Sequence, residues 1–216
     1  MDRRLVIAGY RVAFGALALV AIAWQFLDLA GRGTLNPVNF FSYFTILSNL
    51  IGAVVFLVLA LRWRHERSRT TELVRGGAVV YLSVTLVVFA LLLSGTNVDT
   101  AVGWVNTVVH QVFPIVVIAD WLIDPPSSRI TVRQSLVWLA PALVWLAYTL
   151  IRGAIVDWYP YPFINPANGG YASVAAYAGA IVVFGALLCA AVAFLGTMMG
   201  ERRAPPEPLT EGTRTV

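Results

Sequence analysis

The sequence predicts an all-α integral membrane protein, a bundle of six transmembrane helices. Two observations carry this prediction: composition and segmentation. Apolar residues make up 59% of the 216-residue chain and charged residues only 12%, whereas soluble domains carry about 25% charged residues. The mean hydropathy is +0.77. Six apolar segments separated by short polar ones are each close to the length of about 17–25 residues that crosses a bilayer.

The six predicted spans follow one another along almost the whole chain. They are Leu5–Leu27, Asn39–Leu61, Gly76–Leu93, Gly103–Ile123, Ser135–Ile151 and Tyr171–Leu195. The first is longer than the apolar core of a cleaved signal peptide, which is about 7–15 residues, so we expect a retained signal anchor. Residues 1–200 are therefore expected to form one transmembrane domain. The charged, proline-rich segment 201–216 is expected to be a disordered cytoplasmic tail.

The distribution of arginine predicts the orientation of the bundle. All fifteen basic residues are arginines, a bias typical of GC-rich bacterial genomes. Twelve of them fall on one side of the predicted membrane: Arg3, Arg4, Arg62, Arg64, Arg67, Arg69, Arg75, Arg129, Arg133, Arg202, Arg203 and Arg214. The positive-inside rule then gives N-in and C-in topology in the inner (plasma) membrane of a cell. Because these arginines lie beside apolar spans, the net charge of +4 does not indicate a nucleic-acid partner.

Two polar residues inside the spans are the candidates for function. Thr45 lies about 9 Å into the second predicted span and His110 about 10 Å into the fourth, from the same side of the membrane. Each lies on a polar helix face that is expected to turn away from lipid. These faces are Ser42, Thr45, Asn49 and Gly52 on one span and Gly103, Asn106, Thr107, His110 and Pro114 on the other. Equal depth permits Thr45 and His110 to meet, but helix order remains open.

Structural explanations compete with functional ones at these positions. A threonine hydroxyl in a membrane helix usually bonds to a carbonyl one turn earlier, and a histidine can simply link helices. Arg11 and Asp120 are expected to form an ion pair between the first and fourth spans, because each charge alone would be costly in hydrocarbon. Arg152 is expected either to pair with Asp28 or Asp157 or to receive an anionic ligand group.

The connection between the last two spans is rich in aromatic residues and proline. It runs over residues 152–170 and includes the segment WYPYPF, from Trp158 to Phe163. Tryptophan and tyrosine commonly settle at the membrane–water interface, so an interfacial belt is the simpler interpretation. The alternative is a rigid lid over a pocket that opens outward.

Three motifs resemble the family of androgen-induced and androgen-dependent TFPI-regulating proteins. They are FSYFTILSN (Phe41–Asn49), WVNTVVHQVFP (Trp104–Pro114) and WYPYPF (Trp158–Phe163), in the expected order along the membrane domain. Members of that family are multipass membrane hydrolases that cleave fatty acid esters of hydroxy fatty acids, with a bacterial six-pass branch. By motif position, the catalytic threonine and histidine of the family correspond to Thr45 and His110.

The resemblance implies a hydrolase that acts on a lipid ester through an acyl-threonine. Thr45 would be the nucleophile and His110 its general base. Asn49 and Asn106 lie one turn from these residues and are the candidates to stabilise the oxyanion or to orient the site. Arg152, Tyr148 and Tyr161 are expected to bind substrate. No cofactor is expected, and one intramembrane histidine with scattered acids does not predict a metal site.

Two alternatives from other classes remain open at this point. A small-solute or proton-coupled transporter would use His110 as a binding or relay group, although the chain has no detectable internal repeat. A non-enzymatic lipid-binding or partner subunit would use the same polar residues for assembly. The sequence leaves the oligomeric state and the identity of the ester undetermined.

Overall fold

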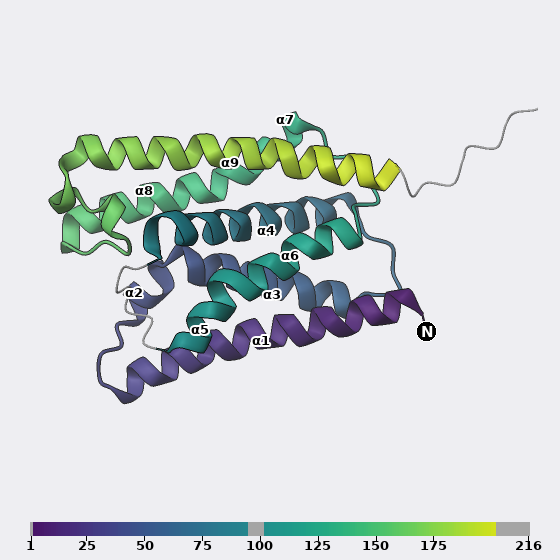
Figure 1. Ribbon diagram of the computed structural model, residues 1–216, viewed down its shortest axis with the longest axis horizontal. Coiled ribbons are helices and arrows are strands. Elements are labelled where there is room, and N and C mark those ends of the chain that lie inside the picture. The colour runs from purple at the N-terminus through teal and green to yellow at the C-terminus, as the bar shows by residue number, and fades with distance from the viewer. Residues whose placement is uncertain (1, 95–101, 202–216) are drawn as a thin grey trace, which may run out of the picture.

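The computed structural model describes residues 2–94 and 102–201, and all regular structure in this part of the chain is helical. Six helices in it are long and apolar enough to cross a membrane, which confirms the predicted fold class. The helices run side by side along the long axis of the molecule (Figure 1). The tail predicted for 201–216 lies, except for Glu201, outside the described residues.

Two of the six spans are interrupted by a short π-helical or 3-10 segment, and a third ends in a π-helical segment. The elements in chain order are α1 (Arg3–Gly31), α2 (Pro37–Ser42), α3 (Phe44–Leu61), α4 (Arg69–Val88), η1 (Phe89–Leu93), α5 (Gly103–Thr107), η2 (Val108–Val112), α6 (Phe113–Ile123), α7 (Val132–Ser135), η3 (Leu136–Trp138), α8 (Leu139–Val156), η4 (Pro162–Ile164), η5 (Pro166–Asn168) and α9 (Gly170–Glu201). Segments η1 and η2 are π-helical.

The second predicted span is not one helix, which corrects the predicted range Asn39–Leu61. Tyr43 is extended, with φ −71° and ψ 126°, and separates α2 from α3. Ser42 is the last residue of α2, and the indole Nε1 of Trp145 donates to its carbonyl at 2.9 Å. The Tyr43 ring packs edge-to-face against Trp158 and Tyr161. Tertiary contacts therefore hold the break in place.

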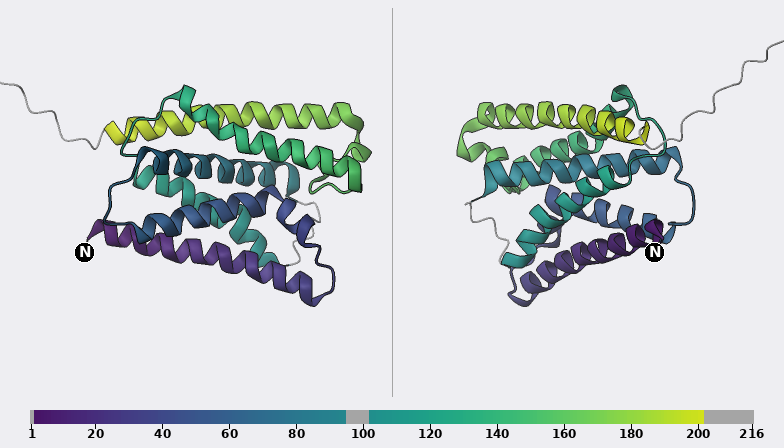
Figure 2. Two further views of the ribbon diagram at one scale, coloured as in Figure 1. Left: turned by 180° about the vertical axis from the view of Figure 1, so that it is seen from behind. Right: turned by 45° about the vertical axis from the view of Figure 1, so that its right-hand side comes forward.

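Helix α4 lies in the middle of the bundle. Helices α1, α3 and α6 lie on one side of it, and α8 and α9 lie on the other (Figures 1 and 2). The core between them includes Phe56, Leu82 and Phe113, each at most 1% exposed. Gly52 permits this close packing, because a Cβ there would come within 2.7 Å of Leu82 Cδ1.

The connections divide the bundle into two ends that differ in charge. We call one the arginine end: it holds the start of α1, residues 62–68 and residues 124–131 (Figure 1). The other, the aromatic end, holds α2, the start of α3 and the connection 157–169 from α8 to α9. Between the two ends, many apolar side chains point outward, as lipid contact requires.

Candidate active site

Thr45 lies in the first turn of α3 because the chain breaks at Tyr43. It is the second residue of the helix, and its side chain is buried. Backbone N–H groups in a first helical turn have no partner within the helix. The N–H of Thr45 instead donates to the hydroxyl of Tyr161 at 3.2 Å. A buried hydroxyl and an N–H without a helical partner thus belong to the same residue.

His110 lies in the π-helical segment η2, four residues before Pro114. Proline has no N–H to bond to the carbonyl of residue 110, and its ring crowds that carbonyl, so a regular helix cannot continue there. Segments of this kind occur frequently at functional sites. The imidazole stacks on Phe89, the first residue of the other π-helical segment, with ring centroids 4.1 Å apart.

Thr45 and His110 meet across the bundle. The Thr45 Oγ1 atom lies 3.3 Å from His110 Nε2, and both side chains are buried. His110 Nδ1 lies 3.1 Å from the backbone oxygen of Asn106. A carbonyl only accepts hydrogen bonds, so in the neutral ring Nδ1 carries the proton and Nε2 presents its lone pair to Thr45. This is the arrangement that a general base requires.

Tyr161 completes the cluster from the aromatic connection. Its hydroxyl lies 3.2 Å from Thr45 Oγ1 as well as 3.2 Å from the Thr45 nitrogen. Burial raises the pKa of Tyr161 to about 12, although its hydrogen bonds with Thr45 act in the opposite direction. Tyr161 is therefore a neutral phenol with a proton to donate. Its burial contradicts the interfacial-belt interpretation for this residue and agrees with a lid that closes on the site.

Asn49 connects α3 to η2 instead of facing a reacting group. Its amide nitrogen donates to the Thr45 carbonyl at 2.8 Å and to the Val109 carbonyl at 2.9 Å. Both hydrogens of the amide are thereby engaged, so of the two roles predicted for Asn49 the contacts allow orientation and not oxyanion binding. Asn106 contacts His110 through its backbone oxygen.

Arg152 and Tyr148 lie at the edge of the site, on α8. Arg152 donates to the Asn39 side chain at 2.6 Å and lies over the Trp158 ring. Among the described residues no carboxylate lies within ion-pair distance of it, and Asp28 pairs with Arg32 instead. The predicted pair with Asp28 or Asp157 is therefore wrong. The Tyr148 hydroxyl lies 3.0 Å from Ser42 Oγ, and its ring is partly exposed.

Two cavities meet at Thr45. An apolar cavity of about 850 Å³, counting its open mouth, lies between α3, α4, α8 and α9. A second, more polar cavity of about 900 Å³ extends past Asn39 and Trp158 and is lined by His110. Thr45, Leu93 and Tyr161 line both cavities. The buried hydroxyl thus lies at a junction that could receive the two halves of an amphipathic ester.

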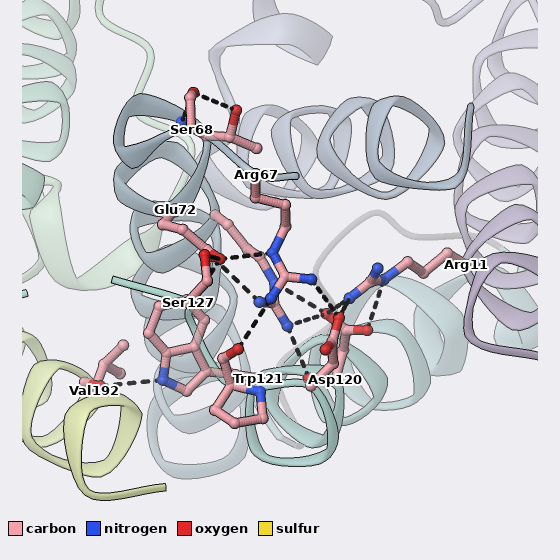
Figure 3. Close-up of polar contacts among 12 residues, drawn as sticks. Arg11, Arg67, Ser68, Glu72, Asp120, Trp121, Ser127 and Val192 are labelled. Carbon is pink, nitrogen blue, oxygen red and sulfur yellow. Dashed lines mark hydrogen bonds and ion pairs between the residues drawn. The ribbon is translucent and has the colours of Figure 1, made fainter. Parts of the chain in front are cut away.

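A charged network occupies the arginine end (Figure 3). The predicted pair between Arg11 and Asp120 is confirmed, with a distance of 2.8 Å. Arg75 also binds Asp120, at 2.7 Å, and its guanidinium lies over the Trp121 ring. Arg75 was predicted to lie on the cytoplasmic side, just before the span that begins at Gly76, but it is buried within α4. Glu72 and Arg75 are three residues apart, a spacing that brings opposite charges together on one helix face and could have predicted their ion pair.

The network continues into the loops. Asp124 accepts from Arg11 at 2.8 Å and from Arg67 at 2.7 Å, and Arg67 also binds Glu72 at 2.6 Å. Burial alone would raise the pKa of Asp124, but the surrounding arginines, Arg67 first, hold it below its usual value. In this network three arginines face three carboxylates, so its charges balance.

Comparisons with known proteins add no assignment to this geometry. No protein-family model, curated protein or solved structure matches the chain. Within residues 2–94 and 102–201, no three His, Cys, Asp or Glu side chains come together in a way that could hold a metal ion.

Proposed function

We propose that this protein is an intramembrane hydrolase of lipid esters that uses Thr45 as nucleophile and His110 as general base. One observation carries the proposal: the 3.3 Å contact between Thr45 Oγ1 and His110 Nε2, buried where two cavities meet. A threonine hydroxyl is a weak nucleophile without an adjacent base. The substrate class is a long-chain ester of the fatty acid ester of hydroxy fatty acid type.

The reaction proceeds in two steps. His110 Nε2 takes the proton from Thr45 Oγ1, which attacks the ester carbonyl and forms a tetrahedral intermediate. The carbon–oxygen bond to the alcohol half then breaks, and the imidazolium returns its proton to the departing oxygen. The resulting acyl-threonine is hydrolysed by water, which His110 deprotonates in the same way. The second collapse frees the fatty acid and restores the Thr45 hydroxyl.

The oxyanion is stabilised by the Thr45 N–H and the Tyr161 hydroxyl. These two groups already bind one another at 3.2 Å beside the nucleophile. When substrate enters, its carbonyl oxygen replaces the Tyr161 hydroxyl as the acceptor of the Thr45 N–H. The Tyr161 hydroxyl then donates to the same oxygen. The phenol must shift with its connection for this exchange to occur. Donors fixed in a buried site stabilise developing charge more than they do in water.

Each of the two cavities holds one half of the substrate. The acyl chain occupies the apolar cavity between α4, α8 and α9, whose lining is almost entirely hydrocarbon and aromatic. The alcohol half occupies the more polar cavity near Asn39 and Trp158, the two residues that Arg152 contacts. Arg152 has no ion-pair partner among the described residues and is available to bind a carboxylate on that half.

The motif resemblance supports the same assignment. Family membership is part of the proposal, as are the bacterial inner membrane and the N-in, C-in orientation. The resemblance and the depth of the polar residues nominate Thr45 and His110 independently. The orientation rests on the twelve arginines that gather on one side. It directs the aromatic end, and with it the site, outward.

The experiment that tests the proposal combines fluorophosphonate labelling with hydrolysis of long-chain esters in lipid nanodiscs. Thr45→Ala and His110→Ala should lower hydrolysis by about 10³-fold or more and abolish labelling. Thr45→Ser keeps a hydroxyl and should retain measurable turnover. Thr149→Ala is the matched control: Thr149 is buried, its hydroxyl has no partner among the described residues, and it lines neither cavity.

The outcomes separate the function classes. Label that maps to Thr45, together with parent-like activity in Thr149→Ala, supports the hydrolase. A folded parent that neither labels nor hydrolyses any long-chain ester would overturn it. Uptake that depends on a gradient would then indicate a transporter. Loss of thermal stability in step with activity in Thr45→Ala and His110→Ala would indicate a structural subunit.

A further inference from the structure

The arginine end contains a large open pocket that the proposed chemistry does not use. It lies between the start of α1, the end of α3 and the connection after α6, and encloses about 1430 Å³ counting its open mouth. Five arginines and two carboxylates line it: Arg3, Arg4, Arg11, Arg62, Arg67, Glu66 and Asp124. The five positive and two negative charges leave an excess of three positive charges.

Three of these arginines have no counter-ion among the described residues. Asp124 is already bound by Arg11 and Arg67. Within the part of the chain that the structure describes, no carboxylate lies within ion-pair distance of Arg3, Arg4 or Arg62, and Arg3 donates only to a backbone carbonyl, that of Ile123, at 2.6 Å. Because Arg11, Arg67 and Asp124 belong to the balanced network beneath the pocket, its rim holds Arg3, Arg4 and Arg62 against Glu66, a net of two positive charges.

The pocket also offers a neutral donor and an apolar wall. The buried Ser128 hydroxyl has no hydrogen-bond partner among the described residues, whereas the Ser127 hydroxyl already donates to Glu72 and the Thr71 hydroxyl bonds to Ser68. Ile7, Val58 and Leu59 contribute hydrocarbon on the side of the spanning helices. Arginine guanidinium groups beside a hydroxyl donor are suited to the oxygens of a phosphate ester.

The position of the pocket indicates that the phosphate belongs to a membrane lipid. Arg3 begins α1 and Arg62 follows the last residue of α3, so both lie where spanning helices leave the membrane. Lipid phosphates occupy this level of a bilayer. Beside the pocket, Leu5 and Leu61 are 51% and 81% exposed and face the surroundings of the bundle. A bound phosphate at this level can thus carry acyl chains.

We propose that this pocket binds the headgroup phosphate of an anionic phospholipid. Arg3, Arg4 and Arg62 contact the phosphate, and the acyl chains follow the outer faces of α1 and α3. A positive-inside bias would also place arginines at this end. That bias requires neither a concave site nor cations that converge without counter-ions. Basic pockets between transmembrane helices commonly bind anionic headgroups.

Native mass spectrometry of the full-length protein in detergent tests the proposal with two lipids of equal acyl chains. The parent should retain dioleoyl-phosphatidylglycerol about ten-fold better than dioleoyl-phosphatidylcholine. The triple variant Arg3→Gln, Arg4→Gln, Arg62→Gln should bind both lipids equally. The matched control, Arg69→Gln, Arg129→Gln, Arg133→Gln, removes the same charge from exposed arginines outside the pocket and should keep the preference.

Three results would overturn the proposal. The parent could show no preference between the two lipids, or the control variant could lose the preference as completely as the pocket variant. Competition by millimolar glycerol phosphate or inorganic phosphate that removes the lipid would assign the pocket to a soluble phosphate instead. Thermal stability of both variants, measured in the same detergent, excludes unfolding as the cause of any loss.

Discussion

The two buried polar clusters of this bundle are built on opposite principles. The cluster at the arginine end is ionic, and five of its six ion pairs are 2.8 Å or shorter. The cluster at the aromatic end consists of Thr45, His110 and Tyr161, and its contacts are longer, at 3.2–3.3 Å. Cavities reach all the way to the second cluster, whereas the pocket at the arginine end reaches only Arg11, Arg67 and Asp124 and leaves Glu72 and Asp120 almost completely enclosed.

The contrast separates stability from reactivity. Buried charges that are fully paired and hydrogen-bonded hold helices in register, and removal of one partner leaves the other unpaired. Neutral groups with longer contacts and adjacent space can exchange their partners for those of a substrate. Near the second cluster, the buried Asn49 Oδ1 atom has no hydrogen-bond partner in the part of the chain that the structure describes, as occurs at functional sites. We therefore expect the two clusters to respond differently to substitution.

The largest effect on stability is expected for Asp120→Ala. This change removes the shared carboxylate of Arg11 and Arg75, both at most 4% exposed, and leaves them only Asp124 and Glu72 as acidic partners. The free energy of unfolding should fall by about 3–5 kcal/mol, as measured by thermal or denaturant unfolding in detergent. The control is Asp28→Ala, which removes a partly exposed pair with Arg32 and should cost at most about 1 kcal/mol. Equal losses in both variants would mean that the network does not stabilise the fold.

The next effect is on activity and concerns Tyr161→Phe. Loss of one oxyanion donor should lower kcat about 100-fold, equivalent to about 2.7 kcal/mol of transition-state stabilisation. Stability should fall by about 1–3 kcal/mol, because the buried Thr45 N–H loses its acceptor although the ring contacts with Phe163 and Tyr43 are kept. Ester hydrolysis and thermal unfolding measured on one preparation separate these effects. An increase in kcat would instead make the phenol a plug that competes with substrate.

The smallest effect is a pH dependence at Asp124. Its pKa is held below the usual value by Arg67, Arg75 and Arg11, against the effect of burial. The ionised carboxylate therefore stabilises the fold above the unfolded-state pKa of about 3.9, and this contribution is lost as the pH falls through the lower folded-state value. Asp124→Asn should cost about 2 kcal/mol near neutral pH.

The difference between the parent and Asp124→Asn should shrink on acidification. Melting temperatures of both proteins, recorded from pH 7 to pH 3 in one detergent, provide the measurement. Because other carboxylates titrate in both proteins, only the difference between them reports Asp124. A difference that stays constant to pH 3 would contradict an ionised, stabilising Asp124.

The sequence predicted the number of spans and the identity of the two central side chains. Hydrocarbon leaves backbone groups no solvent partner, so long apolar segments must be helical wherever they pack. The same cost makes an isolated histidine such as His110, or a lone charge such as Asp120, conspicuous without a structure. The Arg11–Asp120 pair could be predicted because a buried charge needs a partner and few opposite charges were available inside the membrane.

Other features depended on the tertiary structure. The extended Tyr43 between α2 and α3 carries no glycine or proline signal, and contacts with Trp145, Trp158 and Tyr161 hold it. The partner of Arg152 proved to be Asn39, because Asp28 is taken by Arg32 one helical turn away. The four-residue spacing of Asp28 and Arg32 was a local signal for their pair. The break at Tyr43 and the contact of Arg152 with Asn39, in contrast, do not follow from local spacing.

The sequence by itself determined that this chain forms six apolar helices and that Thr45 and His110 lie at similar depth among them. Only the tertiary structure decided that the two side chains touch, that Tyr161 joins them and that two cavities meet there. The physical reason is that hydropathy and helical periodicity act along one chain segment at a time. The order and rotation of helices in a bundle depend instead on packing between segments distant in sequence.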